Sequence, residues 1–401
     1  MNKILLNSIL SISTLTLLLS GCGGSDTTAP LNALSATSGQ LVDSYLENVD
    51  YSCADGKNSV TDVNGSFSCT KLPVTFKLGA LSFGEIDSIA PDGQVFPQDL
   101  VGVSRSDINN SEVLAMANFM QSCDEDRNSS NGIKISAIIK NRFTAQETFN
   151  SLDILSYATD ANITLLPETE STEHLVQTTS YVDDVNSVTT LPADITAALL
   201  TPNSMIDQET KNTLSFMGNE ERLAYDVYNY LYSLYPTLNQ LNNIATKSEI
   251  NHIKSVQLLV KKYISSYTEF TNTDLAELSY KDVAVEDMNA GTYDIQHIQD
   301  LYDLLTLEGA VSEEEALKVG CKIEVIDVLD LDEEISLANA SNADDVVTVF
   351  EYLRDGSYNH YWAFDKGLKN RGIEDGCCSL GVIDGINFCQ PEFPQNIQPK
   401  I

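Results

Sequence analysis

Glutamate and histidine side chains stand at positions that the helical pattern of the C-terminal half assigns to a core. In the segment 239–268, Glu249 and His252 interrupt an apolar stripe, whose other members are Ala245, Val256, Leu259 and Tyr263. The alternating spacing of three and four residues places the whole stripe on one face of a helix. A carboxylate and an imidazole directed into a core are costly unless they are paired or bind a metal ion. This helix is therefore a candidate source of metal ligands.

Three further helical segments, at about 210–235, 312–339 and 343–372, repeat this feature, and a shorter one spans about 294–308. The first places Glu221 in its apolar stripe, and Glu220 is the alternative, on a stripe with a less regular apolar register. The second segment places Glu324 and Asp327 inward, and the third does the same for His360. A single inward Glu or His is ordinarily explained by a hydrogen bond within the core. Several such residues on four helices point instead to one shared site.

Metal ions are the expected partners of these side chains. Neighbouring buried carboxylates raise one another's pKa, so they need a counter-charge. Carboxylates combined with imidazoles are a ligand set for iron, manganese or zinc. We therefore expect a metal site made by six residues: Glu221, Glu249, His252, Glu324, Asp327 and His360.

Four antiparallel helices that each carry a Glu or a Glu-x-x-His form the dimetal-carboxylate site of ferritin-like bundles, and this chain resembles that superfamily. More narrowly, four motifs in the same order resemble the ferritin-like domain of unknown function 2202, over about residues 212–372. They are Glu220-Glu-Arg-Leu-Ala-Tyr-Asp-Val-Tyr228, Asn243-Ile-Ala-x-x-Ser-Glu-x-x-His252, Val319-Gly-x-x-Ile-Glu324-x-x-Asp327 and Gly356-Ser-x-Asn-His360.

The resemblance implies a non-haem centre of iron or manganese that works with oxygen or peroxide. It implies that Glu249 and Glu324 bridge or chelate, while Glu221, Asp327 and the two histidines are terminal ligands. One position departs from the superfamily, because Ser357 stands where the last helix usually supplies a second Glu-x-x-His glutamate. Asp327 is the expected substitute. If it does not reach the site, a mononuclear or asymmetric centre is expected.

Composition limits the partners of the chain. Its 401 residues include 58 Asp and Glu against 23 Lys and Arg, a formal net charge of −35. This charge argues against binding to nucleic acid or to anionic lipid through a basic face. The length exceeds the roughly 250–300 residues at which single cores stop growing, so we expect more than one domain.

The first 22 residues resemble a bacterial lipoprotein signal. Lys3 precedes an apolar run from Ile4 to Leu19, and Leu19-Ser-Gly-Cys22 matches a lipobox whose cysteine becomes lipidated. The residue after the cysteine is Gly23, not the aspartate that retains such lipoproteins in the inner membrane. We therefore expect a lipid anchor at Cys22 in the outer membrane of a Gram-negative cell envelope, with a Gly-, Ser- and Thr-rich tether at 23–38.

Residues 39–90 are expected to form a small β-sandwich module, because short alternating runs are separated by Asp55-Gly56, Asn64-Gly65 and Gly79. The stretch Thr61-Asp-Val-Asn-Gly-Ser-Phe67 resembles carboxypeptidase regulatory-like modules of bacterial surface proteins. Cys53 and Cys69 flank its hairpin and are expected to form a disulfide.

Residues 91–202 are expected to be a helical appendage followed by a polar connector from Leu166 to Pro202. Within the appendage, oxygen-bearing residues from Asp124 to Asn131 alternate as in a calcium loop. They lack the Gly and the closing Glu of an EF-hand at the required offsets, and too few ligands are present, so calcium is not favoured there.

The remaining cysteines are disulfide candidates if the chain enters an oxidising compartment. Cys377, Cys378 and Cys389 lie in the tail at 376–401, where a disulfide is favoured over a zinc site that would need a fourth ligand. Because seven cysteines follow Cys22, at least one should be free or paired between chains, and Cys321, within a helical pattern, is the expected free thiol.

These observations predict a multidomain protein with a β-sandwich on the N-terminal side and a ferritin-like antiparallel four-helix bundle at 203–375. The favoured function is an envelope oxidoreductase whose partners are a metal ion and a small oxidant, with the substrate unassigned. The alternatives are a metal store without turnover and a structural or adhesive surface lipoprotein.

Overall fold

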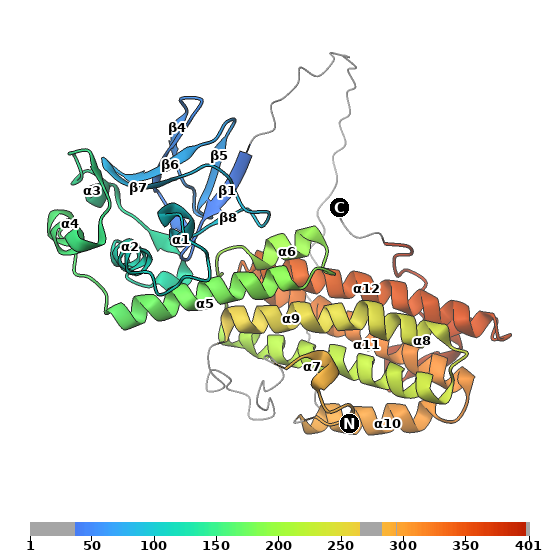
Figure 1. Cartoon of the computed structure of the whole chain (residues 1–401). Coiled ribbons are helices and arrows are strands. Elements are labelled where there is room, and N and C mark those ends of the chain that lie inside the picture. The colour runs from blue at the N-terminus through green and yellow to red at the C-terminus, as the bar shows by residue number, and fades with distance from the viewer. Residues whose placement is uncertain (1–36, 265–282, 294, 398–401) are drawn as a thin grey trace, which may run out of the picture.

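The computed structural model describes residues 37–264, 283–293 and 295–397, and it contains a β-rich part followed by a helical part (Figure 1). The expected signal with Cys22, and all but the end of the tether, lie outside the described residues. The same holds for the end of the helical segment predicted at 239–268.

Two sheets build the β-rich part. In the described chain one sheet has the strand order β5-β1-β8 and the other the order β10-β7-β6-β3-β4. Their strands are β1 (Thr37–Leu41), β3 (Asp50–Cys53), β4 (Asn58–Val60), β5 (Ser66–Cys69), β6 (Val74–Leu78), β7 (Leu81–Ile86), β8 (Gln94–Val95) and β10 (Glu147–Thr148). Phe67 of one sheet packs edge-on against Phe76 of the other, with ring centroids 5.0 Å apart. The two sheets therefore share one apolar core.

Short helices extend this core beyond residue 90. They are α1 (Pro97–Val101), α2 (Ser111–Ser122), α3 (Ala137–Lys140) and α4 (Ile154–Ala161), and the two-residue strands β2 (Leu46–Glu47) and β9 (Ile133–Lys134) pair beside them. Phe119 of α2 is fully buried and contacts the rings of Phe149 and Tyr157. The expected boundary at residue 90 thus falls inside a continuous core that reaches Ala161.

The connector expected at 166–202 is helical instead. Helix α5 (Glu168–Ser187) runs from the β-rich part to the bundle, and α6 (Ala193–Leu199) lies on the bundle (Figure 1). Leu175 packs against α2, whereas Val182 and Val185 join the core of the bundle. Thr and Ser dilute this apolar stripe, so composition alone suggested a polar linker. The helix joins the two parts of the molecule through packing.

Four long helices in the described part of the chain form the bundle, as the sequence predicts. They are α7 (Gln208–Leu234), α9 (Ile250–Tyr263), α11 (Glu313–Ala340) and α12 (Asp344–Lys369), accompanied by the short α8 (Asn239–Ile244), which leads into α9, and by α10 (Gln296–Gly309). The backbone N–H of Glu315 donates to the hydroxyl of Ser312 at 3.2 Å, which caps α11 at the expected residue. Helix α10 lies along the outside of α7 and α11.

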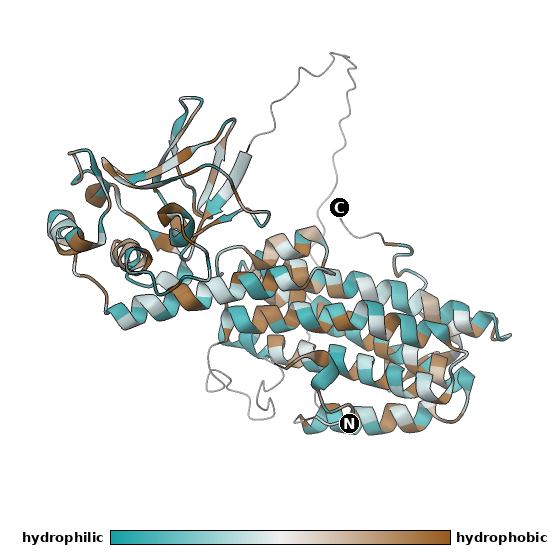
Figure 2. Ribbon diagram, in the orientation of Figure 1, coloured by the Kyte–Doolittle hydropathy of each residue, from teal (hydrophilic) through white to brown (hydrophobic). Residues whose placement is uncertain are grey.

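Two apolar clusters occupy opposite ends of the bundle, and the order in which each helix meets them shows that the helices are antiparallel. Helices α7 and α12 run from the cluster that contains Leu214 and Val346 to the cluster that contains Val227 and Phe364. Helix α11 and the consecutive helices α8 and α9 run the opposite way. Figure 2 shows polar and apolar residues interleaved along each bundle helix. Within the described residues, no helix combines the length and the apolar character needed to cross a membrane.

Three disulfides lie among the described residues. Cys53 bonds to Cys69, Cys378 bonds to Cys389, and Cys321 bonds to Cys377. The expectation of a free thiol at Cys321 is therefore wrong, because α11 turns this residue towards the segment after α12. Within the described chain the free cysteine is Cys123, which is fully buried in the β-rich core. The tail that follows α12 also contains the hairpin of β11 (Val382–Ile383) and β12 (Ile386–Asn387).

Candidate metal centre

A polar layer crosses the middle of the bundle, between the two apolar clusters. It contains buried side chains from all four long helices and from the turn that leads into α9. They are Glu221 of α7, Glu249 and His252 at the start of α9, Glu324 of α11, and Ser357 and His360 of α12. Each is less than 9% exposed. The stripes that the sequence predicts therefore do face a common interior.

Two groups of three side chains within this layer have the spacing of metal ligands. The first joins Glu221, Glu249 and His252, and the second joins Glu249, Glu324 and His360, with the candidate ligand atoms of each group within 4.8 Å of one another. Nδ1 of His252 lies 3.0 Å from Oε2 of Glu221 and 3.0 Å from Oε2 of Glu249. Nδ1 of His360 lies 3.0 Å from Oε1 of Glu249 and 3.4 Å from Oε2 of Glu324.

Glu249 belongs to both groups and offers a different oxygen to each. Its Oε2 faces His252, and its Oε1 faces His360. A carboxylate placed in this way can bridge two ions, with one oxygen on each. The rings of His252 and His360 are stacked, with centroids 5.7 Å apart, so the two imidazoles lie close to each other beside this carboxylate.

A π-helical turn, Ala245–Glu249, precedes α9 and ends at the shared carboxylate. Such turns contain one more residue than an α-helical turn, and they are frequent at functional sites. The extra residue sets the rotation at which Glu249 enters the bundle relative to α8. Nothing in the spacing of apolar residues predicted this turn.

Gly356 of α12 makes room for the first histidine. A Cβ atom built on Gly356 would lie 2.4 Å from Cε1 and 2.5 Å from Nε2 of His252, well inside any real contact. The imidazole therefore rests against the bare backbone of α12. Gly356 occurs in the motif Gly356-Ser-x-Asn-His360, but only the structure gives the reason for a glycine in mid-helix.

The electrostatics of the layer favour protons or cations. Burial raises the pKa of Glu221 to about 8, although His252 beside it opposes the rise. Burial also disfavours charge on Glu249, but the two neighbouring imidazoles outweigh burial and hold the pKa of Glu249 below its ordinary value. Burial lowers the pKa of His360, yet Glu249 and Glu324 raise it overall to about 10. Metal ions would replace the protons that these groups hold.

Two hydroxyl groups orient carboxylates at the edge of the layer. The buried hydroxyl of Tyr228 donates to Oε1 of Glu324, which leaves Oε2 of that carboxylate facing His360. The hydroxyl of Ser357 donates to Oδ2 of Asp327, across from α12 to α11. Second partners of this kind fix the orientation of ligands in metal sites.

The six residues predicted from the sequence therefore do not all lie equally close to one another. Glu221, Glu249, His252, Glu324 and His360 form the two groups, while Asp327 lies beside them without joining either. Burial raises the pKa of Asp327 well above its ordinary value, with Glu221 and Glu324 adding to the rise.

The calcium-like stretch in the β-rich part has its oxygens occupied by backbone donors. Oδ1 of Asp124 accepts from the N–H of Lys134 at 2.8 Å, and Oδ2 accepts from the N–H of Asn128 at 2.8 Å. Asp126 also accepts from Asn128. These hydrogen bonds stabilise the turn.

Comparison with known proteins places the helical part in a family. Residues 210–381 match the family described as uncharacterized protein domain DUF2202. Uncharacterized protein MJ0754 of Methanocaldococcus jannaschii is 35% identical over 171 residues, which is 43% of this chain and 81% of that protein.

The chain belongs to the DUF2202 family.

A crystal structure of hypothetical protein MJ0754 from Methanococcus jannaschii has 34% sequence identity and a TM-score of 0.36, over 43% of this chain and 86% of that one. The DUF2202 region starts in α7 and ends after α12, so it includes both groups of candidate ligands. The β-rich part and helices α5 and α6 precede it.

Proposed function

We propose that the DUF2202 bundle of this protein holds two metal ions, iron or manganese, in a ferritin-like dinuclear carboxylate centre. Glu221 and His252 bind one ion, Glu324 and His360 bind the other, and Glu249 bridges them. Asp327 is a further terminal ligand. The shared position of Glu249, with one oxygen in each group, is the observation that carries this proposal.

The separations between the side chains fit the assignment, and they equal the length of ordinary hydrogen bonds. Two ligand atoms about 2.1 Å from one ion and at right angles to each other lie about 3.0 Å apart. Three of the four nitrogen–oxygen separations in the two groups are 3.0 Å.

Hydrogen bonding alone leaves part of the layer unsatisfied. Nδ1 of His360, although 3.0 Å from Oε1 of Glu249, lacks a well-directed hydrogen bond, and so does Oε1 of Glu221. Buried polar atoms ordinarily have partners. Metal ions in the two groups would supply them.

Iron or manganese bound here would supply redox chemistry with dioxygen or peroxide, so the proposed activity is that of an oxidoreductase. The protein itself contributes a water-poor site between two apolar clusters. Tyr228 holds Glu324 in one orientation, and the carboxylates of the layer supply the negative charge that stabilises the ions.

Metal analysis of the full chain, purified without a metal-scavenging tag and loaded anaerobically with Fe²⁺ or with Mn²⁺, tests the centre. We expect two ions per chain at the centre, none there in Glu249→Ala and at most one in His252→Ala. Glu209→Ala and His297→Ala are matched controls on exposed positions of α7 and α10 and should bind as wild type does. Unchanged metal content in Glu249→Ala would refute the centre.

Turnover separates an enzyme from a store. The loaded protein, supplied with a reductant, should consume hydrogen peroxide or oxygen over many cycles. Consumption that stops after one equivalent per centre would contradict the oxidoreductase proposal and would favour storage.

The same proposal places the chain in the cell envelope, anchored by lipid on Cys22. The disulfides found among the described residues support an oxidising compartment. Cys22→Ser should move the protein from the detergent phase to the aqueous phase when a bacterial lysate is partitioned. Retention of the variant in the detergent phase would contradict the anchor.

A further inference from the structure

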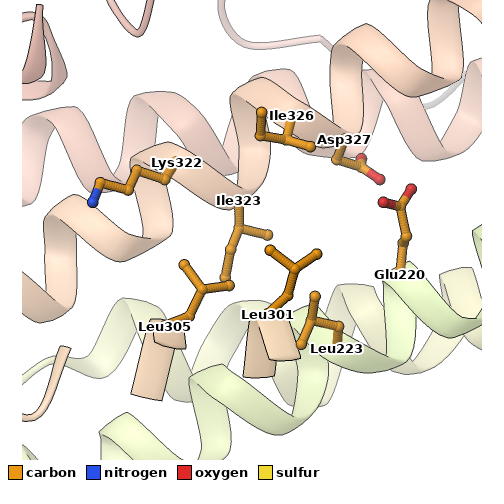
Figure 3. A pocket seen from close by; sticks show the side chains of 8 residues that line it. All are labelled: Glu220, Leu223, Leu301, Leu305, Lys322, Ile323, Ile326 and Asp327. Atoms are coloured by element: carbon orange, nitrogen blue, oxygen red, sulfur yellow. The ribbon is translucent and has the colours of Figure 1, made fainter. Parts of the chain in front are cut away.

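A small cavity of about 80 Å³ lies between α7, α10 and α11, beside the polar layer. Leucine and isoleucine side chains, among them Leu301 and Ile326, form most of its wall. The carboxyl groups of Glu220 and Asp327 stand together at one end and point towards each other (Figure 3). The cavity therefore ends in two acids, one of which borders the proposed centre.

Glu220 is the unusual member of this pair. It is 8% exposed, and its Oε2 has no hydrogen-bond partner. A buried carboxylate oxygen without a partner costs free energy, and it becomes favourable only when a donor or a cation meets it. The centre does not use Glu220, because the neighbouring Glu221 faces the two histidines instead.

The surroundings of Glu220 are acidic. Burial raises its pKa well above the ordinary value, and Asp330, Asp327 and Glu221 raise it further. Asp330 is within hydrogen-bonding contact of Glu220. Lys322, which lines the far end of the cavity, is paired with Glu308 at 2.6 Å. Its ammonium group therefore does not neutralise these carboxylates.

The acids connect the proposed centre with the surface of the bundle. Asp327 and Asp330 stand three residues apart on α11, so they occupy one face of that helix. Glu220 of α7 faces Asp327 (Figure 3). The three carboxylates do not lie within 4.8 Å of one another as the ligand atoms of each group at the centre do, so binding of one cation by all three requires their side chains to close around it. Exposure increases along the row, from the buried Glu220 to the partly buried Asp330 and then to the exposed Glu333. A cation from solvent can approach along this row, and the strongly negative net charge of the chain favours its approach.

We propose that Glu220, Asp327 and Asp330 bind a third divalent cation, outside the dinuclear centre and next to it. Oxygen-only ligands suit a hard divalent cation such as Mn²⁺ or Mg²⁺. The proposal rests on the dinuclear centre, because Asp327 is shared between the two sites. The bound cation would be the partner that Oε2 of Glu220 lacks within the protein.

Titration of the chelator-treated full chain with Mn²⁺, followed by the electron paramagnetic resonance of the free ion, measures the number of sites. Wild type should bind three ions per chain. Glu220→Gln and Asp330→Asn, which keep side-chain shape and remove charge, should each lose one ion or bind it at least tenfold more weakly. Asp332→Asn removes the same charge from an exposed position of α11 that is not part of the row and should bind three. Binding by Glu220→Gln and Asp330→Asn that matches wild type would overturn the third site.

Glu249→Ala separates this inference from the proposed centre. Loss of ions in Glu249→Ala but not in Glu220→Gln would refute the third site and leave the centre standing. Loss of an ion in Glu220→Gln with full binding in Glu249→Ala would refute the centre instead. Melting temperatures of the metal-free variants, which should lie close to that of wild type, check that each one folds.

Discussion

The hydroxyl of Ser357 donates a hydrogen bond to Oδ2 of Asp327, from α12 to α11. Ser357 stands three residues before His360, where the ferritin-like pattern that the sequence resembles has a glutamate, and the bond brings the Asp327 carboxylate from the adjacent helix to the edge of that position. Asp327 is three residues after Glu324, one turn further along α11. Ser357 and Asp327 together thus place a hydroxyl and a carboxylate where a single glutamate would be expected.

Exchange of these two positions tests whether Asp327 replaces the missing glutamate. Asp327→Ser in a Glu220→Gln background, which lacks the third ion, should reduce metal content by one ion, because the layer loses a carboxylate. Combination with Ser357→Glu should restore that ion, because a carboxylate returns from the opposite helix. Elemental analysis of both proteins measures the outcome, with Asp332→Ser on the exposed side of α11 as the control. Metal content that Asp327→Ser leaves unchanged in that background would show that Asp327 is not a ligand.

Metal affinity should rise with pH between about 6 and 8. In the metal-free protein Glu221, with a pKa of about 8, and His360, with a pKa of about 10, hold protons at neutral pH. Metal ligation requires their unprotonated forms, so binding releases protons and becomes more favourable as protons become scarce. Calorimetric titrations at one pH in two buffers of different ionisation enthalpy count the released protons. Equal heats in both buffers would contradict this account.

Gly356→Ala should weaken metal binding by about tenfold or more, the range found when residues that support metal ligands are changed. The added methyl group would collide with the ring of His252, which must then move away from Glu221 and Glu249. Helix propensity alone predicts that this substitution stabilises the protein, because alanine favours a helix over glycine by about 1 kcal/mol. In a His252→Ala background the same change should leave metal affinity unaffected. A further loss in that background would show that Gly356 acts by another route.

Removal of the disulfide between Cys321 and Cys377 should cost about 4 kcal/mol of unfolding free energy, by the chain-entropy estimate for its separation of 56 residues. The Cys378–Cys389 bond spans 11 residues, and its removal should cost about 3 kcal/mol by the same estimate. Urea unfolding of the two double Ser variants compares these losses. A larger loss from the shorter bridge would show that loop entropy does not dominate.

Periodicity predicted the helices and the inward residues of the bundle because both depend on one repeating constraint. Glu221, Glu324 and His360 occupy positions on the apolar face of an amphipathic helix. A side chain at such a position points into the core whatever its type. The choice of Glu221 over Glu220 for the histidine-facing position followed from the same register. Both residues are nevertheless buried, because α10 covers the side of α7 that Glu220 faces.

Local sequence patterns do not encode features that depend on contacts between distant segments. The pairing of Cys321 with Cys377 requires the path of the chain after α12, which no local pattern contains. Helix α5 was missed because its few apolar residues face two different partners, so Leu175 and Val182 belong to separate clusters. The π-helical turn before Glu249 adds one residue to the helix, and no distinctive residue type in the surrounding sequence marks this insertion.

The origin of the ligands has a consequence for how the bundle comes apart. Glu221 and His252 belong to the hairpin of α7 and α9, Glu324 and His360 belong to the hairpin of α11 and α12, and Glu249 reaches from the first into the second. Bound ions would therefore add a cross-link between two hairpins that are otherwise held by side-chain packing and by a few polar contacts, such as the hydrogen bond from Tyr228 to Glu324 and the ion pair between Lys262 and Asp345. With the ions present, amide hydrogen exchange in the two hairpins should follow one common opening event. With the ions removed, each hairpin would be free to open at its own rate.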